Sequence, residues 1–273
     1  MRVQQTVDRS LVHKVGVADV FLMEGAHFSG GEFTLAAQWP RRHWYFGEPA
    51  RRLDPLLVVE TLRQTCLYLA FAHLDVPVDS FVIIDSLRAS CLAARAQPDA
   101  PVDLVIRGRA VLNGGLAATK QIRLETEYRN DGMLLARASG SATVLEPKVY
   151  KRFRELRRTE PAESGATMGD ALQFDRRHPV YFDHPSDHVP GLALLDQALR
   201  LAAPAENISW RPVSLGAKFM RFVELDRAAA INITRERELA SGLQQKRIQV
   251  RQGSLLAAEV SVRVFQVAAV RRQ

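Results

Sequence analysis

The fold of this chain is decided by the stretch RRHWYFGEPARRLDPLLVVETLRQ, residues 41–64, which recurs as RRHPVYFDHPSDHVPGLALLDQALR, residues 176–200. After one inserted residue near Pro179, the two stretches align without a gap at an offset of 136 residues. The matched pairs are Tyr45 with Tyr181, Phe46 with Phe182, Pro49 with Pro185, Leu56 with Leu192 and Glu60 with Asp196. An offset of half the 273-residue chain indicates two similar domains fused in tandem.

Each half predicts the same order of elements: a short strand region, the aromatic stretch, an apolar helix and several strands. In the first half, the short strand region is expected at residues 12–23. The helix is expected from near Pro55 toward His73, because apolar residues recur at helical spacing with no Gly or Pro before Pro77. The further strands are expected between turn signals at residues 81–93, 102–112, 120–129 and 134–145, and in the second half at 218–226, 229–238, 245–252 and 256–270.

One long apolar helix with an antiparallel sheet, present twice, predicts an α+β fold. A sheet that curls around a mostly buried helix is the hotdog fold. We therefore expect a double hotdog, made of two tandem hotdog domains that each wrap a curled antiparallel sheet around a long central helix. The N-terminal domain is expected at residues 1–155 and the C-terminal domain at residues 156–273.

The composition is that of an ordinary globular protein, with 47% hydrophobic and 25% charged residues. The most apolar run, Leu56 to Leu74, contains Glu60 and Arg63, which excludes a membrane-spanning helix there. The start, MRVQQTVDRS, lacks the apolar core of a signal peptide, so a cytoplasmic protein is expected. There is no P-loop, dinucleotide fingerprint or metal-ligand spacing, and two cysteines make no zinc site. We expect no metal and no redox cofactor.

The chain is basic, with a net charge of +7 and a pI near 9.8. This charge suits nucleic acid, a membrane surface, phosphorylated small molecules or an acidic carrier protein. The densest basic stretch runs from Lys148 to Arg158, in a segment that ends in Pro, Ser and Gly as a linker does. A linker helix with a solvated charged face is its simplest interpretation. No helix-turn-helix, zinc finger or aromatic stacking motif supports nucleic acid binding.

Both predicted helices place a carboxylate in the second turn among apolar neighbours. Such a group is costly to bury unless it is paired, hydrogen-bonded or functional. Glu60, Arg63 and Gln64 share one helix face at i, i+3 and i+4, and Asp196 and Arg200 have the i, i+4 relation. An internal ion pair on each helix, with no substrate involved, therefore stays open beside a catalytic role.

Six segments carry a resemblance to a known family, in the expected order along nearly the whole chain: LVHKVGVADVFL (11–22), AQWPRRHWYF (37–46), DPLLVVETLRQ (54–64), PKVYKRFRELR (147–157), RRHPVYFDHPSDHVPGLALLD (176–196) and RFVELDR (221–227). On these segments the chain resembles the A-factor synthase family, which makes γ-butyrolactone autoregulators and consists of two AfsA-like hotdog domains. The helix start with its acid is also similar to the β-hydroxyacyl carrier protein dehydratases.

The resemblance implies an acyltransferase of secondary metabolism and quorum sensing. A β-ketoacyl group passes from acyl carrier protein, or coenzyme A, to a hydroxyl of dihydroxyacetone phosphate. The ester then condenses to a phosphorylated butenolide. This chemistry needs a base, donors for the thioester oxyanion and cations for the phosphate. The chain is expected as a monomer or homodimer without nucleic acid or membrane partners.

The resemblance assigns catalytic candidates. Glu60 is the expected general base, with Arg63 and Gln64 orienting it or the substrate. Asp196 is the second acid, either catalytic or paired with Arg200. His184 stands where dehydratases of this fold carry their histidine, and neighbouring His188 has a weaker claim. A turn whose Asp and His side chains hydrogen-bond the backbone is the alternative for this DHPSDH segment.

The remaining candidates contact the substrate. Gly191 lacks a Cβ, so a thioester can approach the backbone there, and N–H groups near Leu56–Leu57 or Gly191–Leu192 are candidate oxyanion donors. Arg42 and Arg177 are candidate phosphate contacts, with a plain surface role as the alternative. His43 and His178 are expected to be structural.

One departure from the family affects the second site. Members commonly read Glu-Ala-Ala-Arg-Gln on the second helix, whereas this chain has Asp196 and places Leu199 at the arginine position. If only one pocket works, the first helix is expected to line it.

Two other functions stay open: a dehydratase or thioesterase of the same fold, and a non-catalytic acyl-binding protein. The run from His43 to Gly47 has the dehydratase spacing, but Arg52 stands where that motif has proline.

Overall fold

The computed structural model describes residues 5–92, 99–114, 119–158, 169–204 and 209–267. The chain divides into two compact units, residues 1–161 (unit 1) and residues 162–273 (unit 2). The expected domain boundary after residue 155 falls inside a helix, α2 (Pro147–Arg158), and the units divide three residues beyond its end. The rest of the expected linker, residues 159–168, lies outside the described residues.

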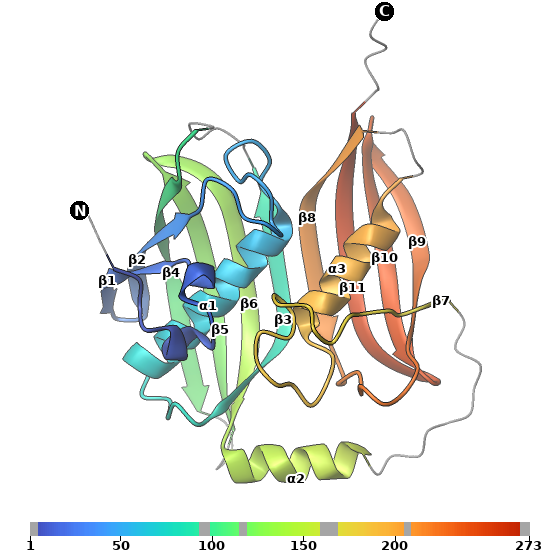
Figure 1. Ribbon diagram of the computed structural model, residues 1–273, viewed down its shortest axis with the longest axis horizontal. Helices are drawn as coiled ribbons and strands as arrows, with labels where there is room; N and C mark the ends of the chain where they lie inside the picture. The colour runs from blue at the N-terminus through green and yellow to red at the C-terminus, as the bar shows by residue number, and fades with distance from the viewer. Residues whose placement is uncertain (1–4, 93–98, 115–118, 159–168, 205–208, 268–273) are drawn as a thin grey trace, which may run out of the picture. The chain divides into compact units, whose positions relative to one another are not determined.

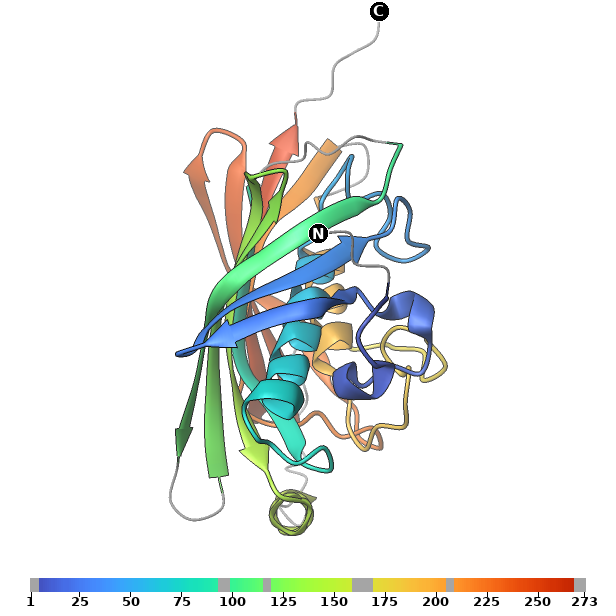
Figure 2. The ribbon, with the colours of Figure 1, turned by 90° about the vertical axis from the view of Figure 1, so that its left-hand side faces the viewer.

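Unit 1 is an antiparallel sheet with a long helix across one face (Figures 1 and 2). Its elements are β1 (Leu22–Ser29), β2 (Glu32–Trp39), α1 (Pro55–His73), β3 (Phe81–Cys91), β4 (Val102–Gly114), β5 (Thr119–Asn130), β6 (Met133–Leu145) and α2. The strand order within the unit is β1-β2-β4-β5-β6-β3, and every neighbouring pair is antiparallel.

Unit 2 repeats this plan in a shorter form. Its elements are β7 (Asp170–Ala171), α3 (Gly191–Ala202), β8 (Ser209–Phe219), β9 (Ala230–Ala240), β10 (Leu243–Gln252) and β11 (Leu255–Val267). The strand order within the unit is β8-β11-β10-β9-β7. In both units a helix is followed by four strands, and the fourth strand pairs with the first and the third. The predicted duplication and the double hotdog fold are confirmed.

The sequence predicts α1 well because its start and its core face are locally encoded. The Asp54 carboxylate accepts a hydrogen bond from the Leu56 N–H, and Pro55 occupies the first turn, where its missing N–H costs nothing. Most of the helix is buried. The Trp39 indole N–H donates to Thr61 Oγ1 at 2.9 Å and the ring stacks on Tyr128, which ties β2 and β5 to the helix.

Two predicted strands are wrong. No strand spans residues 12–23: the 3-10 turn η1 (Arg9–Val12) ends at its start, the 3-10 turn η2 (Val17–Asp19) lies within it, and β1 begins only at Leu22. Residues 218–226 are mostly a loop, whose backbone is held by the Gln252 side chain; the strand β8 comes before it. Proline in a strand argues against a strand prediction, but Pro212 is accommodated where the β8–β11 register shifts. The ends of two predicted strands, residue 93 and residues 268–270, lie outside the described residues.

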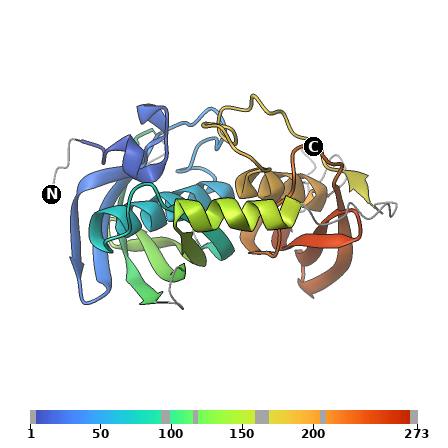
Figure 3. The ribbon, with the colours of Figure 1, turned by 90° about the horizontal axis from the view of Figure 1, so that it is seen from below.

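Helix α2 confirms the helix expected in the basic stretch. Figure 3 shows it along its length. Tyr150 is buried and stacks face to face on Phe81 of β3, with ring centroids 3.8 Å apart, and Arg154 is buried on the same side of the helix. These contacts fix which face of α2 is turned to solvent.

Gly108 in β4 tests how tightly the sheet of unit 1 is packed. A Cβ built there would lie 2.0 Å from the Glu125 carbonyl oxygen and 2.8 Å from the Phe33 ring. Because a backbone carbonyl in a sheet ladder cannot move aside, Gly108→Ala should lower the free energy of unfolding by about 1–3 kcal/mol or more. Urea denaturation measures this loss. Gly114→Ala, in the same strand with nothing within 4 Å, is the control and should change little.

Candidate functional site

The Glu60 side chain is the centre of a buried polar cluster on α1. Only 2% of the residue is exposed. Its Oε1 accepts hydrogen bonds from Arg63 Nη2 and Gln64 Nε2, both at 2.9 Å, and lies 3.2 Å from Lys14 Nζ. Its Oε2 accepts from Arg63 Nε at 2.9 Å. The ion pair considered for this helix is therefore present, and Lys14 joins it from outside the helix.

The charge of Glu60 is strongly stabilised. Burial by itself raises the pKa of this carboxyl, but the charges of Arg63 and Lys14 and the hydrogen bonds from Arg63 and Gln64 outweigh burial and lower the pKa to about 2. A general base works best when its pKa lies near the working pH. A carboxylate with four donors and such a low pKa is a weak base, so the geometry favours a positioning role for Glu60.

The same cluster fastens the N-terminal segment to α1. Gln64 Nε2 donates to the Asp19 carbonyl, and Gln64 Oε1 accepts from the Phe21 N–H. Arg63 Nη2 also donates to the Val12 carbonyl at 3.1 Å. Sequence reasoning missed Lys14, whose only signal is that one lysine, next to His13, stands in a mostly apolar stretch, LVHKVGV.

The first turns of the two central helices differ in whether their backbone N–H groups have acceptors. At α1, the Leu56 N–H donates to the Asp54 carboxylate and the Leu57 N–H to the Asp54 carbonyl, so these expected oxyanion donors are already engaged. At α3, the cap residue is Pro190, which has no capping side chain. Among the described residues, the N–H groups of Gly191 and Leu192 have no acceptor.

Gly191 does permit close approach, but the structure shows a protein group there. A Cβ at this position would lie 3.3 Å from the Phe219 ring of β8. Because Gly191 has no side chain, Phe219 can pack against the start of α3. A thioester that approached the backbone there would have to share this space with the Phe219 ring.

Asp196 on α3 is more accessible than Glu60 and has fewer partners. Arg200 Nε donates to Asp196 Oδ2 at 2.7 Å, as the i, i+4 spacing predicts. The Arg200 side chain is 65% exposed and the Asp196 side chain 10%. Asp196 Oδ1 has no hydrogen-bond partner in the part of the chain that the structure describes. One carboxylate oxygen of this pair therefore stays open to another ligand.

Of the unit 2 histidines, His178 lies within electrostatic range of Asp196. Burial lowers the pKa of His178, while the Asp196 charge acts in the opposite direction. Its Nδ1 accepts from the Val180 N–H, which places the proton of the neutral ring on Nε2, and the ring stacks on Tyr181. His178 thus combines a structural role, as expected, with a position near the carboxylate.

The histidines of the DHPSDH segment lie elsewhere. His184 is exposed. His188 Nδ1 lies 2.7 Å from Asp187 Oδ1 and its ring packs on Phe222. Ser186 Oγ donates to the His188 carbonyl, so this bond to the backbone comes from a serine and not from the Asp and His side chains of the expected turn.

His43 is held on both ring nitrogens. Nδ1 accepts from the N–H groups of Tyr45 and Phe46, and Nε2 lies 3.1 Å from Asp19 Oδ1. This arrangement supports its expected structural role.

The candidate phosphate contacts are on the surface: Arg42 is exposed, and the Arg177 side chain is 93% exposed. Leu199, at the family's arginine position, is buried with the apolar residues of unit 2.

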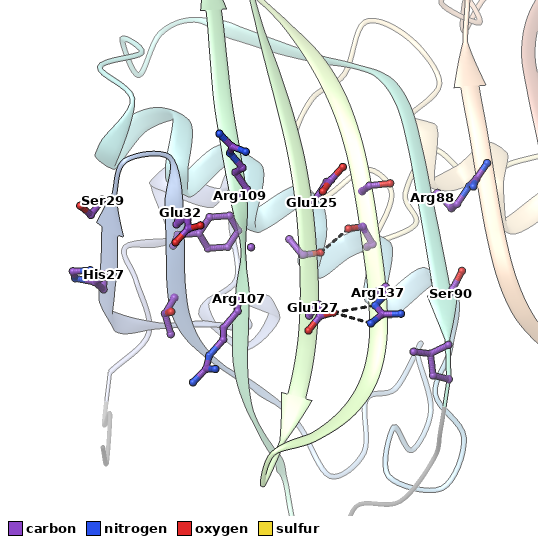
Figure 4. A pocket seen from close by; sticks show the side chains of 17 residues that line it. His27, Ser29, Glu32, Arg88, Ser90, Arg107, Arg109, Glu125, Glu127 and Arg137 are labelled. Atoms are coloured by element: carbon purple, nitrogen blue, oxygen red, sulfur yellow. Dashed lines mark hydrogen bonds and ion pairs between the residues drawn. The ribbon is translucent and has the colours of Figure 1, made fainter.

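Sequence reasoning also missed a hollow of about 1050 Å³ on the face of the unit 1 sheet that points away from α1 (Figure 4). Two cross-strand rows line it, Thr34–Arg107–Glu127–Arg137–Ser90 and Glu32–Arg109–Glu125–Ser139–Arg88. Glu127 accepts hydrogen bonds from Arg129 and Arg137, which lower its pKa. The unpaired charges of this hollow, counted over the described residues, are three arginines and two glutamates: Arg88, Arg107, Arg109, Glu32 and Glu125.

Two further findings concern the described residues alone. No three His, Cys, Asp or Glu side chains gather there in a way that would hold a metal ion. No helix among them is long and apolar enough to cross a membrane.

Glu60→Gln tests the positioning role. The change leaves the Lys14 and Arg63 charges without a buried counter-charge, so the free energy of unfolding should fall by about 3–5 kcal/mol. Adding Lys14→Met should recover part of this loss, because it removes one of the two stranded charges. Denaturation in urea measures both variants. The exposed, unpaired Glu125→Gln is the control; an equal loss there would contradict the assignment.

The pH dependence of stability follows from the lowered pKa of Glu60. Its ionised form contributes stability that is complete above the unfolded pKa of about 4.5 and is lost as the pH falls toward 2. The stability difference between the wild type and Glu60→Gln should therefore shrink by about 3 kcal/mol between pH 5 and pH 2. Denaturation curves of both proteins across this range measure it. A difference that stays constant with pH would show that Glu60 is not ionised in the folded state.

Comparison with known proteins agrees with the fold and extends it. The model of the AfsA family, the A-factor biosynthesis hotdog domain, matches residues 1–146 and 160–268. A 2-oxo-3-(phosphooxy)propyl 3-oxoalkanoate synthase from Streptomyces virginiae is 34% identical over 256 residues, which cover 81% of this chain and 85% of the relative. A synthase of the same name from Streptomyces coelicolor is 28% identical and covers 92% of this chain and 89% of the relative.

Solved structures share the fold at low identity. A 12:0-ACP thioesterase from Umbellularia californica superposes with a TM-score of 0.55 at 9% identity, over 88% of this chain and all of that chain. An acyl-ACP thioesterase from Bacteroides thetaiotaomicron gives 0.53 at 9% identity, over 85% of this chain and 97% of that chain. The family model covers both units, so the chain belongs to the AfsA family of A-factor biosynthesis hotdog proteins.

Proposed function

We propose that this protein is a γ-butyrolactone biosynthesis enzyme that transfers a β-ketoacyl group from a carrier-bound thioester to dihydroxyacetone phosphate. The observation that carries the proposal is the 34% identity, over most of both chains, to a 2-oxo-3-(phosphooxy)propyl 3-oxoalkanoate synthase. That name describes an ester of a β-keto acid with dihydroxyacetone phosphate.

The reaction has two steps, acyl transfer and an intramolecular condensation. The free hydroxyl of dihydroxyacetone phosphate attacks the thioester carbonyl, the C–S bond breaks, and the carrier thiol leaves with the hydroxyl proton. The carbon between the two carbonyls of the acyl group then attacks the ketone of the triose. Loss of water gives the phosphorylated butenolide. Both steps need a base, and the first needs donors for the oxyanion of the tetrahedral intermediate.

Candidates for the base, the oxyanion donors and the phosphate-binding cation all lie on one helix, α3 of unit 2. Among the described residues, Asp196 Oδ1 and the N–H groups of Gly191 and Leu192 have no hydrogen-bond partner. Arg200 is largely exposed beside Asp196, as a cation for phosphate requires. We therefore assign the base to Asp196, phosphate binding to Arg200 and positioning to Glu60. This assignment departs from the expectation that the first helix lines the working pocket.

Asp196→Asn should separate catalysis from stability. Loss of a general base costs about 10²–10⁴-fold in rate. We expect kcat to fall in this range with an unchanged melting temperature, because the amide keeps the shape and one acceptor oxygen. Glu238→Gln, an exposed carboxylate in the same unit, is the control. Full activity in Asp196→Asn would show that another group is the general base.

The reaction itself is tested by mass spectrometry. Purified protein is mixed with a β-ketoacyl carrier protein, with and without dihydroxyacetone phosphate. The proposal expects the phosphorylated ester or butenolide only when the triose phosphate is present. Free β-keto acid in both mixtures would indicate a thioesterase, and an untouched thioester would indicate an acyl-binding protein.

A further inference from the structure

One face of helix α2 carries an excess of positive charge. Lys148, Lys151 and Arg152 are exposed, and none of them has a hydrogen bond or ion pair with any residue that the structure describes. The opposite side of the helix is fixed, because Tyr150 is buried on Phe81 and Arg154 is buried beside it. The basic side chains are therefore held at the surface by the packing of the helix.

The same face includes an apolar side chain. Leu156 lies one turn after Arg152 and is 64% exposed. Glu155, the only acid in the helix, is exposed three residues after Arg152 and four after Lys151, so it lies on the same face. The face therefore carries three cations and one carboxylate, and the sequence of the helix ends in two more arginines, Arg157 and Arg158. A cationic helix face with one exposed leucine suits an acidic protein surface that offers both carboxylates and an apolar contact.

The hollow on the unit 1 sheet is the alternative charged surface, but it carries both signs. Its unpaired Arg109 stands between unpaired Glu32 and Glu125 across the strands, and Arg107 stands opposite Glu127 (Figure 4). The arginines of the hollow would attract an acidic partner, but its glutamates would repel the same partner. The α2 face, with three cations to one carboxylate, has the larger excess of positive charge, and charge complementarity therefore favours α2.

We propose that the face of α2 formed by Lys148, Lys151, Arg152 and Leu156 is the docking surface for the acyl carrier protein that delivers the β-ketoacyl group. This inference rests on the proposed function, which requires an acyl donor, and it commits the donor to an acidic carrier protein. Exposed charges at an interface act mainly on association and its salt dependence. The α2 face is therefore expected to affect binding of the donor and not the chemical step.

The test compares two variants of equal charge change in the full-length protein. One is Lys148→Gln/Lys151→Gln/Arg152→Gln on α2. The matched control is Arg88→Gln/Arg107→Gln/Arg109→Gln in the hollow, which also removes three exposed, unpaired cations. Each is assayed with dihydroxyacetone phosphate and one of two donors, a β-ketoacyl carrier protein or the same acyl group on N-acetylcysteamine. Binding of the holo-carrier protein is measured separately by fluorescence anisotropy at increasing NaCl.

We expect the α2 variant to raise KM for the carrier-bound donor and Kd for the holo-carrier protein by about tenfold or more. Its kcat, and its kcat/KM with the small thioester, should stay within about twofold of the wild type, as should all values of the control variant. The NaCl dependence of carrier binding should flatten in the α2 variant alone.

Three results would overturn the inference: equal losses in the two variants, an unchanged Kd in the α2 variant, or an equal loss with the small thioester. Binding to vesicles rich in anionic lipid that is lost in the α2 variant, with carrier binding unchanged, would assign the face to a membrane surface. Failure of the proposed function would be seen differently, as a wild type that binds carrier but forms no phosphorylated product from either donor.

Discussion

The buried ion pair between Glu60 and Lys14 is the interaction on which the organisation of unit 1 depends. A carboxylate in the middle of an apolar helix is tolerable only if its charge is matched, and here Lys14, Arg63 and Gln64 match it. The partners in turn bring the chain between Val12 and Phe21 onto α1. One buried charge thus fixes the position of an entire segment that has little regular structure of its own.

The two units show how equivalent residues of a duplicated fold can have different surroundings. Both central helices begin at equivalent positions of the repeat, Pro55 and Gly191, and both carry their acid in the second turn. Asp54 closes the start of the first helix, whereas Pro190 leaves the second one open. Both carboxylate oxygens of Glu60 accept hydrogen bonds, whereas Asp196 Oδ1 has no partner among the described residues. The surroundings of the two acids therefore differ because of single residues near the helix starts.

The net charge of +7 is distributed unevenly, and that distribution carries more information than its total. On the outer face of the unit 1 sheet, arginines alternate with glutamates across neighbouring strands, so the fields largely cancel. On α2 the cations have a single acid among them. Such a separation lets a concentrated field attract one charged partner to one place on the surface.

The sequence by itself determined the duplication, the bounds of α1 and the pairs on each helix, because these depend on residues close together in the chain. Asp54 and Pro55 start the helix, and the i, i+4 spacing brings Arg200 to Asp196 without any other element. The tertiary structure alone decided that Lys14 reaches Glu60, that Pro212 fits a strand at a register shift, and which carboxylate stays accessible. Each of these depends on segments that meet only after folding, where burial and the partner's geometry set the charge and the access of a side chain.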